Sequence, residues 1–218
     1  MSDPPGRRLA GRRPAGSDGS GVPTFGDRRR ARIGLLGGSF NPAHEGHRHI
    51  AELALRRLRL GQVWLLVSPG NPLKPAGGMA APAARLAAAR RIADGRRIVA
   101  TDIESRLGTR YTADTLGELR RRFPRARFVW LMGADNLAQL PRWRRWRRIV
   151  GHVALAVLPR PSYNHAALAG HASRRLRAAR RPAHMASVLA GLAPPAWVFL
   201  PGPQHSASAT AIRAATGV

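Results

Sequence analysis

Residues 37–47 read GGSFNPAHEGH and follow directly on the apolar run Ile33–Leu36. Two glycines at the end of a strand let the backbone come close to a ligand, and a helix that starts just after them offers unpaired N–H groups to an anion. His44 and His47 are three residues apart at the entrance of that helix, so both can face the same phosphates. The spacing predicts a strand, a phosphate-binding turn and a helix.

Better-known signatures do not fit the same residues. The stretch is not the Gly-x-Gly-x-x-Gly of a dinucleotide site, and it lacks the Gly-Lys-Ser/Thr ending of a P-loop. It is not the His-Glu-x-x-His of a zinc site either, because Arg48 stands where the second histidine would be. Two other interpretations stay open from spacing alone: a metal-binding His44–His47 pair, for which no third ligand is evident, and two solvated histidines in a loop.

The rest of the chain alternates short apolar runs with helical patterns. Further strands are predicted at 62–68, 97–103, 128–132, 153–158 and 197–200. Helices are predicted at 46–60, 83–93, 112–122, 136–149, 165–192 and 209–215, with Pro82 starting the second, Thr112 capping the third and Pro141 interrupting the fourth. This alternation predicts an α/β fold with a Rossmann-like, doubly wound parallel sheet. Ligands of such sheets bind beyond the carboxyl ends of the strands, near the switch point.

Composition narrows the class of protein. The chain has 218 residues, of which 44% are hydrophobic, enough for a core. It has no cysteine, which excludes disulfides, Cys-ligated zinc, iron–sulfur clusters and thiol catalysis. Its longest apolar runs are strand-sized, far short of the roughly 20 residues of a membrane helix. The N-terminal arginines precede no apolar segment, so we expect a cytoplasmic protein without a secretory signal.

The charge is strongly basic. Lys and Arg number 37 against 11 Asp and Glu, a net charge of +26. Lys74 is the only lysine, however, and Ala, Gly and Pro are plentiful. We interpret this skew as the product of a GC-rich coding sequence that fills surface positions with arginine, so nucleic acid is not an expected partner. Real affinity for polyanions, including phosphorylated metabolites, stays an alternative.

Residues 1–30 contain Pro, Gly, Ser and Arg with almost no large apolar side chains. Such a segment cannot bury enough surface to offset its ordering entropy. We therefore predict a disordered leader over 1–30 and one domain over 31–218. A nucleic-acid-binding basic arm is the alternative, but the interleaved aromatic residues that would support it are missing.

Two segments resemble the nucleotidyltransferase superfamily. Residues 37–47 match its phosphate-binding signature, Gly-Gly-Ser/Thr-Phe-Asp/Asn-Pro-x-His-x-Gly-His, and residues 208–213, SATAIR, are similar to its C-terminal Ser-Ser/Ala-Thr-x-Ile-Arg segment. Ser and Thr hydroxyls, a helix N-terminus and an arginine make a second anion site, although alone they would be an ordinary helix cap. The resemblance implies ATP contacts from Gly37, Gly38, Ser39, Phe40, His44, His47, Gly133, Asp135, Ser208, Thr210 and Arg213. His44, His47 and Arg213 would be the catalytic members.

The middle of the chain resembles one family within that superfamily, the nicotinate mononucleotide adenylyltransferases. The resemblance rests on RYTADTL at 110–116, GADNL at 133–137, LPRW at 140–143 and PRPSY at 159–163. It implies that an aromatic residue stacks on the pyridine ring, a Tyr-Thr segment binds the carboxylate and an aspartate contacts a ribose. The implied mononucleotide-binding residues are Asn71, Lys74, Tyr111, Thr112, Asp135, Trp143 and Arg160. The histidine that the family has in the loop around Lys74 is absent from this chain. Lys74 itself is the candidate for the contact with the mononucleotide phosphate.

The resemblance implies transfer of the adenylyl group of ATP to nicotinate mononucleotide, with pyrophosphate as the second product. Mg²⁺ would come bound to ATP, and no protein metal site is expected. Within the superfamily, the amidated mononucleotide or another phosphorylated acceptor is the alternative. From another class, an arginine-rich nucleic-acid binder on the same scaffold stays open. The oligomeric state is not readable from the sequence.

Overall fold

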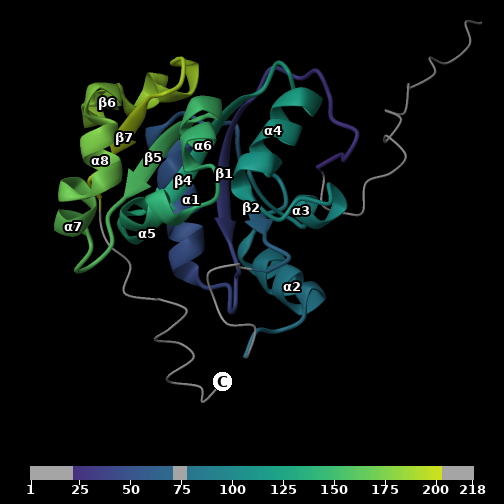
Figure 1. The fold of residues 1–218 in the computed structure, drawn as a ribbon. Helices are drawn as coiled ribbons and strands as arrows, with labels where there is room; N and C mark the ends of the chain where they lie inside the picture. The colour runs from purple at the N-terminus through teal and green to yellow at the C-terminus, as the bar shows by residue number, and fades with distance from the viewer. Residues whose placement is uncertain (1–21, 71–77, 203–218) are drawn as a thin grey trace, which may run out of the picture.

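The computed structural model describes residues 22–70 and 78–202. Within these ranges seven strands form one sheet in the order β3-β2-β1-β4-β5-β7-β6, and every neighbouring pair is parallel (Figure 1). The strands are β1 Arg32–Gly38, β2 Gln62–Val67, β3 Ile98–Thr101, β4 Arg127–Gly133, β5 Ala154–Leu158, β6 Arg180–Arg181 and β7 Trp197–Phe199. The predicted doubly wound parallel sheet is confirmed.

The α-helices are α1 Glu45–Arg57, α2 Pro82–Ile92, α3 Ile103–Arg106, α4 Thr112–Arg122, α5 Ala134–Gln139, α6 Trp146–His152, α7 Asn164–Ala169 and α8 His171–Arg175. Three 3₁₀ segments join them: η1 Leu140–Arg142, η2 Arg177–Ala179 and η3 Ala183–Gly191. Pro82 is the first residue of α2, where its missing N–H has no partner to lose. The predicted break at Pro141 is also confirmed, because Pro141 lies in η1 between α5 and α6.

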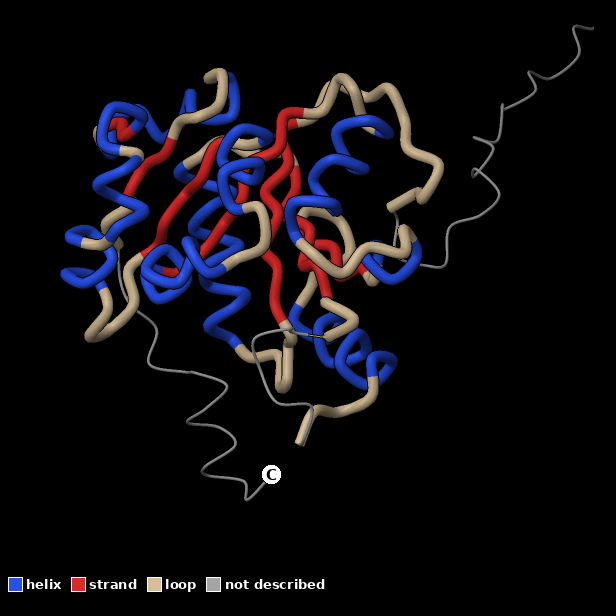
Figure 2. Tube along the Cα trace, in the orientation of Figure 1, coloured by secondary structure: helices blue, strands red, loops and turns tan. Residues whose placement is uncertain are grey.

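Each strand contributes side chains to two hydrophobic layers, one on each face of the sheet, because successive side chains point to opposite faces. Leu35 and Trp130 pack on the face covered by α3 to α8, whereas Leu36 and Leu131 pack on the face covered by α1, α2 and η3. Figure 2 shows the strands running through the middle of the molecule with helices on both sides. Both faces of the sheet are therefore buried, as a parallel sheet requires.

The winding direction changes between β1 and β4. The chain moves outward from β1 through β2 to β3 and then returns to place β4 on the other side of β1. The registers pair Leu36 with Leu131 and Gly133 with Leu158, so the carboxyl ends of β1, β4 and β5 lie at one edge. The residues that follow these three strands are consequently brought together.

Three sequence predictions need correction. The strand predicted at 97–103 ends at Thr101, and Ile103 already begins α3. The N-cap of α4 is Tyr111, and Thr112 is its first helical residue. The region 165–192 is not one helical stretch: Gly170 separates α7 from α8, and β6 extends the sheet beyond β7 before Pro182 starts a 3₁₀ segment. A two-residue edge strand carries too little periodicity to be found by pattern. The helix predicted at 209–215 lies outside the described residues.

The last residues of the predicted leader pack against the domain. Val22 is 1% exposed, and its carbonyl accepts hydrogen bonds from the Arg106 guanidinium at 3.2 Å. The carbonyl of Thr24 accepts another from Arg122 at 2.6 Å. Packing therefore begins before residue 31, whereas residues 1–21 lie outside the described part of the chain and their disorder stays a prediction. No helix in the described ranges is long and apolar enough to cross a membrane.

Candidate active site

Two histidines lie together at the head of α1. His44 is the N-cap residue in an extended conformation, and His47 occupies the third helical position. The His44 N–H donates to Nδ1 of His47 at 3.3 Å, the His47 N–H donates to the His44 carbonyl at 2.8 Å, and the ring centroids are 3.8 Å apart. The predicted position of both histidines at the entrance of a helix is confirmed, whereas their contact with phosphates stays a prediction.

The protonation state of His47 follows from these contacts. Burial lowers its pKa to about 3, and the neighbouring His44 and Arg160 charges act in the same direction. The ring is therefore neutral near pH 7. Because Nδ1 accepts the His44 N–H, the proton resides on Nε2, which is left as a hydrogen-bond donor. A phosphate oxygen placed at Nε2 would be bound by a charge-assisted hydrogen bond and would raise this pKa again.

The turn before the histidines is shaped by packing as well as by its predicted closeness to a ligand. A Cβ on Gly37 would lie 2.6 Å from the Trp130 ring, so no side chain fits there. Phe40 adopts a left-handed conformation with φ of 50° and is 1% exposed. Its ring packs 4.8 Å from that of His47, so the Phe40 side chain supports the histidine from the core.

A buried arginine that the sequence analysis did not single out holds this turn in place. Arg85 of α2 is 2% exposed and donates to the carbonyls of Ser39 at 2.9 Å, Ser68 at 2.7 Å, Pro69 at 3.3 Å and Ala80 at 2.9 Å. It thereby ties the turn after β1 to the turn after β2. Because the chain contains so many arginines, nothing in the local sequence marked Arg85 as important. The one available clue was its place on the apolar face of a predicted helix.

The side chain of Asn41 adds a second tie across the same turns. Its amide donates to the Gly78 carbonyl at 3.0 Å, and its oxygen accepts the Ala80 N–H at 3.2 Å. The segment before α2 is thus held against the GGSFNP turn at both ends. The turn is positioned before any ligand arrives, which reduces the ordering cost of binding.

An acid–base pair follows β4 and β5. Asp135 Oδ1 lies 3.7 Å from Arg160 Nε, and it is buried without a hydrogen-bond partner. Asn164 accepts the Arg160 N–H at 2.8 Å and so fixes the loop that carries the arginine. A Cβ on Gly133 would collide with Asp135 Oδ1 where it now stands, so a side chain there would displace the Asp135 carboxylate. Since Arg160 is one of the charges that lower the His47 pKa, this pair faces the histidines across the β1–β4 edge.

The predicted mononucleotide residues Trp143, Tyr111 and Thr112 lie on the α4–α6 side of this edge. Trp143 packs edge-on to Trp130 with ring centroids 6.3 Å apart, and it remains half-buried. Tyr111 precedes Thr112 at the start of α4, and the Arg144 guanidinium lies 4.5 Å above its ring. Arg144 was not predicted. It brings a positive charge beside the Tyr-Thr segment. This charge would stabilise an anionic group bound there.

A buried polar network supports the Tyr-Thr segment. Glu104 is 5% exposed, and its carboxylate accepts a hydrogen bond from the Thr115 hydroxyl at 3.0 Å. The Thr115 and Thr109 hydroxyls are 2.9 Å apart, and the Thr109 N–H donates to the Glu104 carbonyl at 2.9 Å. The network closes the loop 104–115 and thereby fixes the position of Tyr111 and Thr112.

Five predicted residues lie outside the described part of the chain: Asn71, Lys74, Ser208, Thr210 and Arg213. Ser39 and Gly38 are at the turn, as predicted, and are half-buried. Within the described residues, no three metal-ligating side chains are grouped together.

Comparison with known proteins shows which family shares this sequence. A model of the cytidylyltransferase-like family matches residues 35–215. Probable nicotinate-nucleotide adenylyltransferases from Gluconacetobacter diazotrophicus and Gluconobacter oxydans are 63% and 64% identical over 195 and 182 residues. The matches cover 89% and 84% of this chain, and 91% and 93% of those proteins. The chain belongs to the nicotinate-nucleotide adenylyltransferase family.

A solved structure of another protein has the same fold as this chain. The nicotinic acid mononucleotide adenylyltransferase of Plasmodium falciparum, complexed with APC, superposes with a TM-score of 0.62 at 16% identity. The match covers 84% of this chain and 83% of that one. The same enzyme has also been solved in complex with NaAD.

Proposed function

We propose that this chain transfers the adenylyl group of ATP to nicotinate mononucleotide, giving nicotinate adenine dinucleotide and pyrophosphate. The observation that carries the proposal is the meeting of two groups at the β1–β4 switch point. The His44–His47 pair, in which His47 is neutral, lies at the head of α1, and the Asp135–Arg160 pair lies beside it. Family membership supplies the identity of the substrates.

The reaction needs positioning and charge stabilisation more than a reactive side chain. A phosphate oxygen of the mononucleotide attacks the α-phosphorus of ATP, and the bond to pyrophosphate breaks on the opposite side. His47 Nε2–H and the first N–H groups of α1 are the donors available to the phosphoryl oxygens. His44 fixes the tautomer of His47 through its backbone N–H. We assign the Gly37–Gly38–Ser39 turn to the same phosphates, with Arg213, Ser208 and Thr210 as further predicted contacts.

The mononucleotide is assigned to the other half of the site. Trp143 offers a half-buried aromatic face for the pyridine ring, and Tyr111 and Thr112 offer N–H and hydroxyl donors for its carboxylate. Arg144, above Tyr111, favours an acid over an amide at that point. Asp135 is placed to accept from a ribose hydroxyl, and Arg160, with the predicted Asn71 and Lys74, to bind the mononucleotide phosphate.

Mg²⁺ is proposed to arrive with ATP, where it neutralises charge on the phosphates. Most side chains around the proposed phosphate positions are neutral or cationic; the carboxylates near them include Asp135, which already faces Arg160, and Glu45, which is exposed in the first turn of α1. Such donors suit phosphate oxygens and leave the metal to the nucleotide and water. We also propose a cytoplasmic location, which fits an enzyme that consumes ATP.

The test is pyrophosphate release from ATP and Mg²⁺ with nicotinate mononucleotide and, in parallel, with its amide. We expect strong preference for the acid, in line with the charge beside Tyr111. Equal use of both substrates would retain the chemistry and remove the specificity assigned to Tyr111, Thr112 and Arg144. Release with neither would refute the proposed acceptor.

A further inference from the structure

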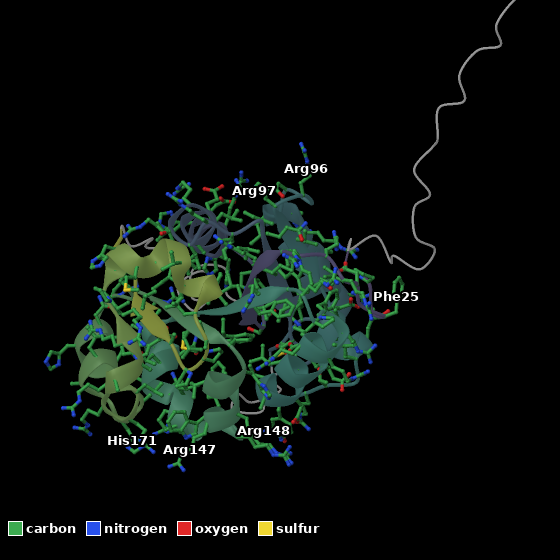
Figure 3. All side chains as sticks on the ribbon, turned by 90° about the horizontal axis from the view of Figure 1, so that it is seen from above. Phe25, Arg96, Arg97, Arg147, Arg148 and His171 are labelled. Carbon is green, nitrogen blue, oxygen red and sulfur yellow. The ribbon has the colours of Figure 1, made fainter. Side chains whose placement is uncertain are left out.

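A basic cavity of about 820 Å³ lies at the amino ends of β1, β4 and β5, at the opposite end of the sheet from the candidate active site. Its basic side chains are Arg30, Arg32, Arg120, Arg125 and Arg127, and His152 also lines it. Figure 3 shows this end of the molecule from above. Many side chains with blue nitrogen atoms are visible between Arg96 and Arg97 at one margin and Arg147 and Arg148 at the other. None of the residues assigned above to the proposed reaction lines this cavity.

The positive charge of the cavity is not compensated. No Asp or Glu lines it, and within the described residues none of its five arginines is ion-paired with a carboxylate. Arginines elsewhere do find acids: Arg106 lies 2.9 Å from Asp102, for example. A second concave surface, lined by Arg147, Arg175 and Arg181, also has no Asp or Glu, so it is the arrangement of the arginines and not the absence of acids that distinguishes this cavity.

The register of the sheet places two of these charges side by side. Arg32 and Arg127 are the first residues of β1 and β4, and they are direct partners in the parallel register. Partners in neighbouring strands are roughly 4.8 Å apart and project from the same face. Two cations so placed repel each other, and a bridging anion between them removes that repulsion.

The remaining polar groups of the lining are also arranged for a ligand. Arg120 is anchored by the carbonyl of His152 at 3.0 Å, at the last turn of α6. Nε2 of His152 is buried and has no hydrogen-bond partner. Because the Arg120 guanidinium, which can only donate, lies 3.4 Å from Nδ1 of His152, the neutral ring carries its proton on Nε2 and can donate one further hydrogen bond there.

We propose that this cavity binds a small polyphosphate anion. Paired arginines bind adjacent phosphates well, because each guanidinium offers several N–H donors in one plane. The concave shape and the apolar Phe123 and Phe128 among the lining residues fit a compact ligand better than the long convex backbone of a nucleic acid. The shared chemistry is a chain of two or more phosphates, which either a nucleotide or inorganic polyphosphate can supply.

The test is isothermal titration of the full chain at physiological ionic strength, with saturating nicotinate adenine dinucleotide present to fill the active site. The probes are inorganic triphosphate, ATP and a single-stranded oligodeoxynucleotide. We expect triphosphate to bind with one equivalent per chain. Arg32→Gln/Arg127→Gln should weaken it at least about tenfold, because two charge-assisted contacts are lost. The same variant should retain its adenylyl-transfer rate.

The matched control is Arg56→Gln/Arg91→Gln, which removes the same charge from exposed positions on α1 and α2. Equal weakening in this control would overturn the proposal, since binding would then follow net charge alone. Absence of triphosphate binding, or tighter binding of the oligonucleotide than of triphosphate, would also overturn it. ATP binding as tightly as triphosphate would identify nucleotides as one source, and weaker ATP binding would indicate inorganic polyphosphate. If Arg32→Gln/Arg127→Gln unfolds, Arg30→Gln/Arg125→Gln provides the same comparison, and triphosphate binding does not depend on the proposed reaction.

Discussion

Replacing Glu104 by glutamine should change how the stability of the domain depends on pH. Burial raises the pKa of this carboxyl to about 7 from its ordinary 4.5, against the opposing effect of the Thr115 hydrogen bond. The folded chain therefore holds a proton on Glu104 at pH values where the unfolded chain has lost it. Stability contributed by this group is full below pH 4.5 and is lost as the pH rises toward 7.

The size of the effect follows from that difference. At about 1.4 kcal/mol per pKa unit, the interval from 4.5 to about 7 corresponds to roughly 3 kcal/mol. Glutamine resembles the neutral acid in shape and still offers an oxygen to Thr115, so Glu104→Gln should escape this loss. The free energy of unfolding of the wild type, measured by urea denaturation, should fall by roughly 3 kcal/mol relative to the variant between pH 4.5 and pH 8.

Glu118→Gln is the control, because Glu118 is half-exposed and its pKa is lowered by hydrogen bonds from Arg121 and Arg122. Its removal should give a small effect of the opposite sign, a loss of stability that is greater at high pH than at low pH. Parallel pH profiles for the wild type and Glu104→Gln would refute the reasoning, since they would mean that Glu104 ionises as an exposed carboxyl does.

Three further substitutions test the site. His47→Ala should lower turnover about 10²- to 10³-fold, as expected for loss of one donor to a developing charge, with an unchanged unfolding midpoint; normal turnover of the folded variant would remove His47 from the mechanism. Trp143→Ala should raise KM for the mononucleotide roughly tenfold and leave that for ATP unchanged, since stacking on one ring is lost; equal changes in both KM values would exclude stacking. Arg85→Met should destabilise the domain by about 3 kcal/mol in urea denaturation, because four backbone carbonyls lose their buried donor; a loss below about 0.5 kcal/mol would show that water replaces the guanidinium.

Much of the fold was predictable because its strands are short, apolar and separated by clear helical patterns. The positions of β1, β2, β4 and β5 and the placement of His44 and His47 at the start of a helix follow from local sequence, and the structure confirms them. Edge strand β6 was missed because two arginines, Arg180 and Arg181, have neither the length nor the alternation of a strand. Their pairing with β7 depends on tertiary contact alone.

The supporting residues of the site were not predictable for a related reason. Arg85, Arg144 and Glu104 act through contacts with segments distant in the sequence or with backbone carbonyls, and no motif marks such contacts. Among so many arginines, only burial distinguishes Arg85 from its exposed neighbours on α2. Motifs predicted the groups that we propose to contact the ligand, and the structure was needed to find the groups that hold them in place.

Trp130 links three positions that any redesign of this enzyme must treat as one. Its ring occupies the space a Cβ on Gly37 would need, and it presents its edge to Trp143. A side chain at Gly37 is therefore tolerable only with a smaller residue at 130, and a smaller residue at 130 withdraws the support of Trp143. Directed evolution toward other acceptor rings should consequently find productive changes at these positions as combined replacements, and libraries that vary them one at a time will sample mostly inactive proteins.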